Sequence, residues 1–173
     1  NDTTPEYIFF STLPGQINYS GGCSSSTTAA SADNNTIDFR KLGGGVLDER
    51  TYDNCTISVT SSGNLTSDNL SVDNFTIDIT APSVDNFTMS DTQIKVGETA
   101  TVQLVFSEAV ISFSSTADIT VPNGSLSTMT SSDNITWSGT FTPATNAEDA
   151  SNRLSLATSY TDTAGNNGPA ATT

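Results

Sequence analysis

One short junction occurs twice in the sequence, and this repetition constrains the fold more than any other feature. Asp2-Thr3-Thr4-Pro5 opens the chain, and Asp78-Ile79-Thr80-Ala81-Pro82 stands near its middle. A Ser/Thr-rich stretch follows each junction and contains a Gly-Asn turn, at Gly63-Asn64 and at Gly165-Asn166. Self-similarity of this kind is typical of tandem arrays of small domains. We therefore expect a piece of a longer array, with domains at 1–78 and 83–173 and a linker at 79–82.

Apolar and polar residues alternate along many short runs, such as Thr101–Phe106. This period of two predicts half-buried strands, and turn residues about every ten positions are typical of a β-sandwich. Strong helix signals are absent, and Ala144–Asn152 is expected to be a loop with room for one helical turn. The fold class is therefore all-β. The predicted strands are Tyr7–Phe10, Gly15–Ser20, Thr36–Arg40, Cys55–Thr60, Leu70–Asp78, Val84–Ser90, Thr99–Ser107, Ile119–Val121, Ser125–Ser131, Thr136–Thr142, Leu154–Tyr160 and Pro169–Thr173.

The charge of the chain excludes two classes of partner. Only 5 residues are Lys or Arg, against 19 Asp or Glu, so the formal net charge is −14. An acidic surface repels nucleic acid and anionic lipid, because both bind basic patches. No run of about 18 apolar residues occurs, so we expect no direct membrane insertion. The acidity suits cation binding, and it equally suits the solubility of an extracellular protein.

Two cysteines, Cys23 and Cys55, lie in the first half of the chain. A pair of cysteines in an acidic, Ser/Thr-rich chain indicates an oxidising compartment and a disulfide. Such a bridge would stabilise the first domain by about 3–4 kcal/mol in the chain-entropy model. Two buried thiols are the alternative.

The second half of the chain resembles a known family. Five motifs occur in the order found there: Lys95–Thr99, Phe106–Val110, Ile135–Trp137, Phe141–Pro143 and Asp162–Asn166. Together they resemble a bacterial Ig-like repeat of giant surface adhesins and biofilm-associated proteins of RTX type. The resemblance covers residues 82–173 and is weaker over 3–78, where Tyr52–Thr60 and Gly63-Asn64 carry it. It implies two tandem immunoglobulin-like β-sandwich domains.

A calcium site is the sharpest chemical prediction. In an Ig-like sandwich, the loop after the second strand and the loop before the last strand lie at the N-terminal pole. Those loops hold Glu108 and the Asp162–Asn166 turn, and the linker side offers Asp78. We therefore predict an interdomain Ca²⁺ held by Asp78, Glu108, Asp162 and Asn166, as the family resemblance also implies. The alternative is a turn capped by Asp162, a solvated Glu108 and an Asp78 bonded to the linker backbone. In the first half, Thr60 stands where the family pattern has Asp, which argues against an equivalent site there.

Sequons for N-glycosylation are frequent, because 10 of the 15 asparagines are followed by x-Ser or x-Thr. Strand alternation offers an alternative explanation, since it places polar residues on both sides of an apolar one. Beyond Asn1, the sequon asparagines are Asn18, Asn34, Asn54, Asn64, Asn69, Asn74, Asn86, Asn123 and Asn134.

Catalysis is not expected. The chain has no histidine, so a Ser-His or Cys-His triad cannot form, and the commonest zinc ligand is missing. The only tryptophan, Trp137, stands in an alternating strand and is expected in the core, with sugar stacking as the alternative. Tyr52 lies near the tyrosine-corner position of Ig-like folds and is expected to be structural.

These observations predict a structural extender module of an extracellular cell-surface adhesin or fibre, which provides reach and stiffness in adhesion or biofilm formation. The expected partners are neighbouring Ig-like repeats of the same chain and other copies in a fibre. The expected location is extracellular, on the cell surface or secreted. A repeating subunit of a glycosylated filament and a carbohydrate-binding module remain the alternatives.

Overall fold

The computed structural model describes residues 2–145 and 152–173. The chain divides into two compact units, Asn1–Ile79 and Thr80–Thr173. Almost all of the regular structure is β, so the predicted all-β class is confirmed. Among the described residues the one helix is α1, Ser115–Asp118, a single turn that the sequence did not predict. The predicted loop at Ala144–Asn152 falls mostly on residues 146–151, which lie outside the described residues.

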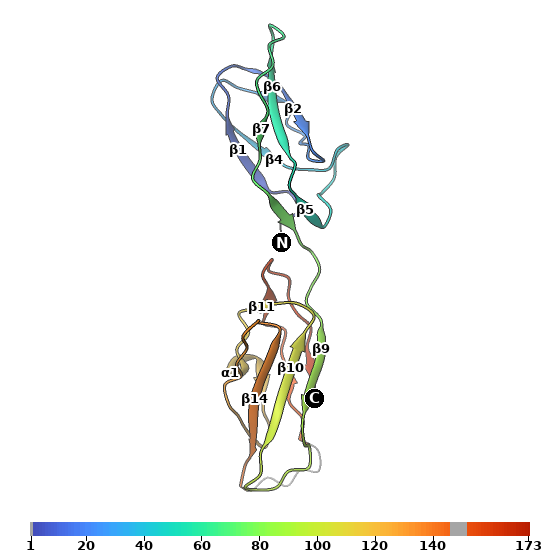
Figure 1. Ribbon diagram of the computed structural model, residues 1–173, viewed down its shortest axis with the longest axis vertical. Coiled ribbons are helices and arrows are strands. Elements are labelled where there is room, and N and C mark those ends of the chain that lie inside the picture. Colours follow the sequence, from blue (N-terminus) through green and yellow to red (C-terminus); the bar gives the residue numbers. More distant parts are fainter. Residues whose placement is uncertain (1, 146–151) are drawn as a thin grey trace. The chain divides into compact units, whose positions relative to one another are not determined.

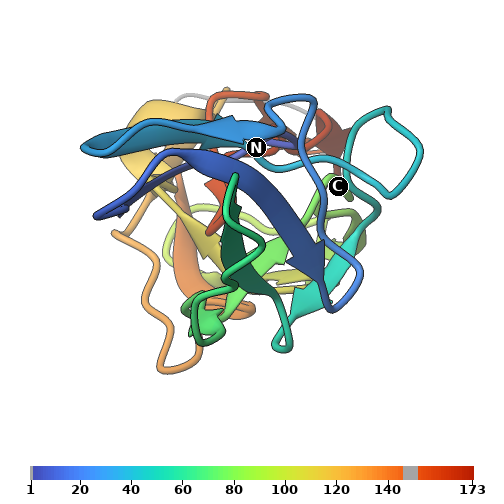
Figure 2. The ribbon, with the colours of Figure 1, turned by 90° about the horizontal axis from the view of Figure 1, so that it is seen from above.

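The described residues of unit 1 form eight short strands in two layers. A four-stranded sheet has the order β3-β2-β6-β7, and the pairs β1-β4 and β5-β8 form the other sheets, all antiparallel. In the view of Figure 2, β1 and β2 lie in different layers. The strands are β1 Glu6–Phe10, β2 Gly15–Ser20, β3 Ala29–Ala30, β4 Asn34–Asp38, β5 Arg50–Tyr52, β6 Thr56–Ser61, β7 Leu70–Ser71 and β8 Phe75–Ile77.

The core of unit 1 lies between these layers and combines aliphatic, aromatic and sulfur groups. Ile17, Ile37 and Ile57 are each at most 3% exposed. The rings of Phe39 and Phe75 stack at 5.7 Å. Burial of this apolar surface drives folding, but a unit of this size buries a modest core, so a covalent link adds significantly to its stability.

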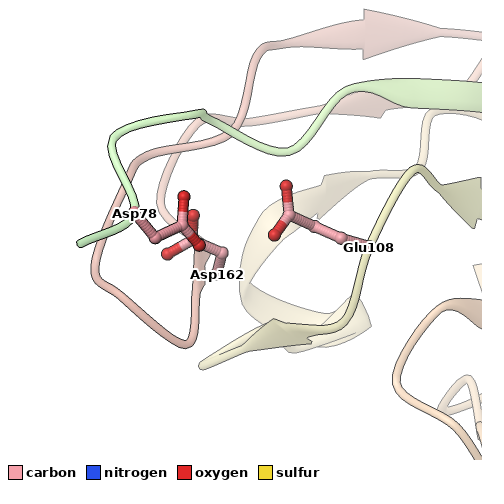
Figure 3. A group of neighbouring side chains, drawn as sticks. All are labelled: Asp78, Glu108 and Asp162. Atoms are coloured by element: carbon pink, nitrogen blue, oxygen red, sulfur yellow. The ribbon is translucent and has the colours of Figure 1, made fainter. Parts of the chain in front are cut away.

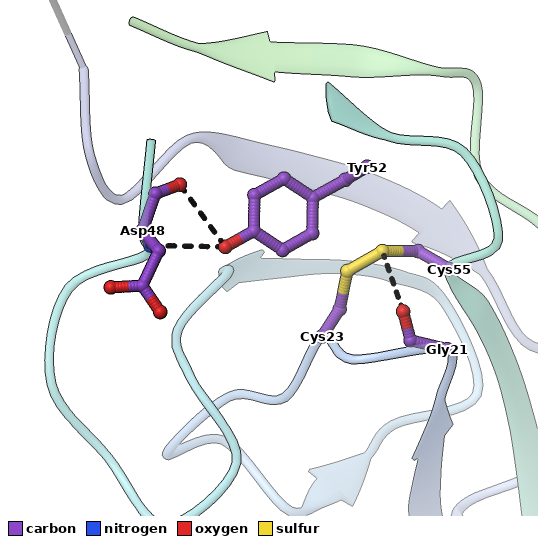
Figure 4. Close-up of a disulfide and its surroundings, with 5 residues drawn as sticks. All are labelled: Gly21, Cys23, Asp48, Tyr52 and Cys55. Carbon is purple, nitrogen blue, oxygen red and sulfur yellow. Dashed lines mark hydrogen bonds between the residues drawn. A yellow bond between two sulfur atoms is a disulfide. The ribbon is translucent and has the colours of Figure 1, made fainter. Parts of the chain in front are cut away.

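The predicted disulfide and the predicted structural tyrosine are both present (Figure 4). Cys23 and Cys55 are bonded, with their Cα atoms 5.7 Å apart, and both are 2% exposed. The Tyr52 hydroxyl accepts a hydrogen bond from the Asp48 N–H at 3.0 Å and donates to the Asp48 carbonyl at 3.3 Å. Tyr52 therefore fixes the chain a few residues upstream of β5, as a tyrosine corner does.

The described residues of unit 2 form nine strands and α1. One sheet has the order β13-β14-β10-β9, and smaller sheets pair β11 with β16 and join β12, β15 and β17. Figure 1 shows β9, β10 and β14 side by side. The strands are β9 Val84–Met89, β10 Ala100–Phe106, β11 Val110–Ile111, β12 Ile119–Thr120, β13 Gly124–Leu126, β14 Thr136–Pro143, β15 Ser155–Leu156, β16 Thr161–Asp162 and β17 Ala171–Thr172.

The central strand β10 shows why this sequence forms a sandwich. Its inward residues Ala100, Val102, Leu104 and Phe106 are at most 1% exposed, while Thr101 and Gln103 point to solvent. A period of two buries one face only, which sets the register of the neighbouring strands. Trp137 packs against this core, as predicted.

An Asp-Asn pair marks the start of many strands. Such a pair stands within two residues of the first residue of β4, β6, β7, β8 and β14, and each is followed by x-Ser or x-Thr. At β14, Asp133 Oδ1 accepts hydrogen bonds from the N–H groups of Ile135 and Thr136, both at 2.9 Å. The Asp133 carboxylate therefore fixes the turn that leads into β14.

Four predicted strands are wrong in extent. Two of them only shorten: Ser125–Ser131 to β13 and Pro169–Thr173 to β17. The other two change sheets. The run Leu70–Asp78 is divided into β7, which pairs with β6, and β8, which pairs with β5. The run Leu154–Tyr160 shortens to β15, and β16 follows with a different partner. In both cases the chain crosses from one sheet to another, which local alternation does not reveal.

Candidate metal centre

Three predicted ligands come together. Asp78 follows β8, Glu108 lies between β10 and β11, and Asp162 is the last residue of β16. One carboxylate oxygen from each lies within 4.8 Å of the others, and no other group of three such ligands occurs among the described residues. Figure 3 shows the carboxylates of Asp78 and Asp162 side by side and that of Glu108 directed toward them. Long-range structure therefore unites residues that are up to 84 positions apart in the sequence.

The turn after β16 holds Asp162 rigidly. Asp162 is completely buried, and its Oδ1 accepts hydrogen bonds from the N–H groups of Ala164 and Asn166 at 2.8 and 2.9 Å. The Gly165 N–H reaches the Asp162 carbonyl at 3.3 Å, and Gly165 has a φ of 88°. Glycine adopts this left-handed conformation without steric cost, which explains the Asp-x-x-Gly-Asn spacing.

Asp162 is held in its ionised form despite its burial. Burial opposes the charge, but hydrogen bonds from the Asn166 side chain and from the N–H groups of Asn166, Ala164 and Gly165 outweigh it. The net effect lowers the pKa of Asp162. A carboxylate that is ionised, buried and fixed is suited to bind a cation.

Asn166 contacts the cluster as a hydrogen-bond donor. Its Nδ2 donates to Asp162 Oδ2 at 2.7 Å and to the Thr80 carbonyl at 3.1 Å, and its side chain is buried. It therefore orients Asp162 and attaches the segment before β9 to the turn. This orienting role was not predicted, because the sequence shows the spacing of the turn but not the partner at Thr80. The predicted role of Asn166 as a direct ligand stays a prediction.

The donor set fits a hard divalent cation. All three side chains offer oxygen, which Ca²⁺ and Mg²⁺ prefer. Two oxygens bound to one Ca²⁺ at about 2.4 Å lie at most about 5 Å apart, and the observed limit of 4.8 Å satisfies this condition. Backbone carbonyls and water would complete the six to eight oxygens that Ca²⁺ takes.

The predicted sequon asparagines lie at the surface. Those in the described chain are exposed, apart from the half-buried Asn86. The buried Asn35, Asn152 and Asn166 are all outside sequons. The fold gives several sequons a structural role at strand starts, so sugar attachment stays a prediction, which the intact mass of the native protein would decide.

A comparison against protein-family models assigns the second half of the chain to a family. The model described as bacterial Ig-like domain matches residues 78–173, a segment that contains all four predicted ligands. The chain belongs to this family. Bacterial Ig-like domains are typically extracellular structural or adhesion-type modules. A search of curated proteins and a search of solved structures found no match. Within the described residues, no helix has the length and apolarity needed to cross a membrane.

Proposed function

We propose that this bacterial Ig-like chain is a spacer of an extracellular adhesin or fibre, which provides reach and stiffness and performs no catalysis. The observation that supports it best is the presence of two compact β units in one chain, each with its own closed core. Stacked small domains divide a long protein into segments that resist extension separately. Neighbouring repeats of the same chain would be its main partners, and other copies would join it in a fibre.

Calcium is the second part of the proposal. Asp78, Glu108 and Asp162 would hold the ion, and Asn166 would keep Asp162 in place. Three carboxylates this close repel one another, and a divalent ion converts the repulsion into attraction. The ion would tie residue 78 to the turn after β16, so the linker would keep fewer mobile residues and the chain would stiffen.

A carbohydrate-binding function receives less support. Trp137 is the natural platform for a sugar, yet its ring packs against Phe113 with centroids 4.8 Å apart. The Trp137 indole nitrogen is enclosed and has no hydrogen-bond partner. A stacking platform must instead present an open ring face.

The mechanical role can be measured directly by pulling single molecules of the 173-residue chain from its two ends. A spacer should unfold in separate steps that each need force, and full extension of the 94 residues of unit 2 should add roughly 30 nm. The disulfide should prevent residues 24–54 from being stretched until reductant is added. Extension without a force step would contradict the proposal.

The calcium role can be measured by calorimetric titration of the same chain. We expect binding at millimolar calcium or below, with a rise in the melting temperature of unit 2 and a narrower range of shapes in small-angle scattering. Glu108→Gln should weaken binding at least about tenfold, because it removes one charged ligand. Glu98→Gln is the matched control, since Glu98 is exposed and pairs with Lys95 outside the cluster. Equal affinity in both variants would exclude this site.

A further inference from the structure

Large apolar side chains gather on one part of the surface of unit 1. Ten such side chains are exposed in the described chain. Four of them, Phe10, Leu13, Leu65 and Leu70, line two adjoining hollows, and Phe10 is 64% and Leu65 72% exposed. Scattered exposed apolar residues are ordinary, but a contiguous group indicates an interaction surface.

The two hollows form one groove. They have volumes of about 210 and 160 Å³ and share Ser11, Thr12, Val59 and Ser67. One wall is the end of β1, and the other consists of β6 and the segment 65–70. The buried Phe9 and Ile57 lie at its base. The groove is therefore deep enough to reach the core of unit 1.

The groove lies between two strand edges. In the described part of the chain, β1 pairs with β4 alone and β7 pairs with β6 alone. Strands β1 and β7 thus end their sheets, and Figure 1 shows them next to each other. Phe10 of β1 and Leu70 of β7 both line the groove, so it lies between these two edges. An edge strand offers backbone N–H and C=O groups to an incoming extended chain, which is how strand addition recognises peptides.

The charges around the groove indicate which kind of partner would bind in it. None of the described residues that line it is charged. Two exposed acidic residues lie next to its lining: Asp33, whose backbone carbonyl accepts a hydrogen bond from the Ser11 N–H at 3.0 Å, and Asp68, whose backbone carbonyl accepts one from the Ser67 hydroxyl at 2.9 Å. A second copy of this chain would bring a net charge of −14 to these carboxylates. A basic partner would instead be attracted.

We propose that this groove binds an extended segment of a different polypeptide, which adds a strand between β1 and β7. Its apolar side chains, at every second position, contact Phe10, Leu13, Leu65 and Leu70. Its intervening Lys or Arg side chains face Asp33 and Asp68. This binding site is independent of the calcium cluster and goes beyond the spacer function.

The test uses the 173-residue chain and a fluorescein-labelled peptide in which Val and Lys alternate over eight positions. Fluorescence anisotropy should show saturable binding. A peptide of four Val followed by four Lys has the same composition and charge but no apolar face as a strand, so it should bind at least about tenfold more weakly. A Val-Glu alternating peptide should not bind.

Variants of the chain locate the site. Phe10→Thr and Leu65→Thr should each weaken binding about tenfold, because each removes an apolar contact while leaving the core intact. Leu42→Thr is the matched control, since Leu42 is 83% exposed in the same unit but outside the groove. The proposal is overturned by equal binding of the alternating and block peptides, by wild-type affinity in both groove variants, or by no binding at millimolar peptide. Sedimentation equilibrium that shows dimers lost in Leu65→Thr would overturn it in favour of a second copy.

Discussion

At the scale of single residues, Gly168 shows how tightly the core of unit 2 is closed. A Cβ atom at this position would lie 2.0 Å from Tyr160 Cε2, and Tyr160 is completely buried, with its hydroxyl donating to the Pro169 carbonyl at 2.8 Å. We predict that Gly168→Ala lowers the free energy of unfolding of unit 2 by about 2–3 kcal/mol, because the ring or the backbone must shift. Urea unfolding followed by Trp137 fluorescence reports on this unit.

Gly63→Ala is the control for this prediction, since the nearest atom to its added Cβ would be 3.8 Å away. Gly63 lies in unit 1, so its effect is read from the calorimetric transition of that unit. This substitution should change the free energy of unfolding by less than about 0.5 kcal/mol. Equal stability of the Gly168→Ala variant and the wild-type protein would show that the backbone at 168 can move away from the ring.

The sequence predicted the three carboxylates of the candidate site but not the hydrogen bonds that orient them. Asp78, Glu108 and Asp162 could be chosen because loops at one pole of an Ig-like sandwich meet there. The hydrogen bond from Asn166 to the Thr80 carbonyl could not be predicted, since it depends on how the chain before β9 turns. Ligand types are thus local information, while the groups that orient them depend on tertiary structure.

At the scale of elements, the carboxylate at the start of β14 makes a pH-dependent contribution. Hydrogen bonds from the N–H groups of Thr136 and Ile135, together with the Ser131 hydroxyl, lower the pKa of Asp133. The folded state therefore favours the ionised form. This contribution is present above the unfolded pKa of about 4 and is lost as the pH falls through the lower folded value.

We predict that Asp133→Ala lowers the melting temperature of unit 2 at pH 7 and that the difference from wild type disappears toward pH 2. Scanning calorimetry across this range measures the effect. Asp85→Ala is the control, because Asp85 also precedes an Asn-x-Thr sequence, but its carboxylate accepts a hydrogen bond from the Ser83 hydroxyl rather than from backbone N–H groups. A difference that persists unchanged in acid would mean that Asp133 acts by some means other than its charge.

The same scale shows which strands a sequence can reveal. The long alternating strands β2, β9, β10 and β14 lie close to their predicted ranges, because five or more residues establish a period of two. The strands β3, β5, β11 and β16 have two or three residues each and were not predicted. A run of two or three residues shows no alternation of apolar and polar residues. It is a strand only because it pairs with a neighbouring strand in the folded protein.

At the scale of the whole molecule, each unit has its own core, and the disulfide lies in unit 1 alone. The chain should therefore unfold in two calorimetric transitions. Removing a crosslink between residues 32 positions apart frees the unfolded chain and costs about 3–4 kcal/mol. For a unit of this size, that loss lowers the melting temperature by roughly 15 °C.

Reductant should then lower the melting temperature of unit 1 and leave that of unit 2 unchanged. Calcium should raise only the melting temperature of unit 2. The Cys23→Ala/Cys55→Ala double variant should reproduce the effect of reductant and abolish any further response to it. A single transition, or two that move together under reductant, would mean that the units do not unfold independently. Independent unfolding matters for a spacer, because one unit can then yield under load while its neighbour keeps its fold and its proposed ion.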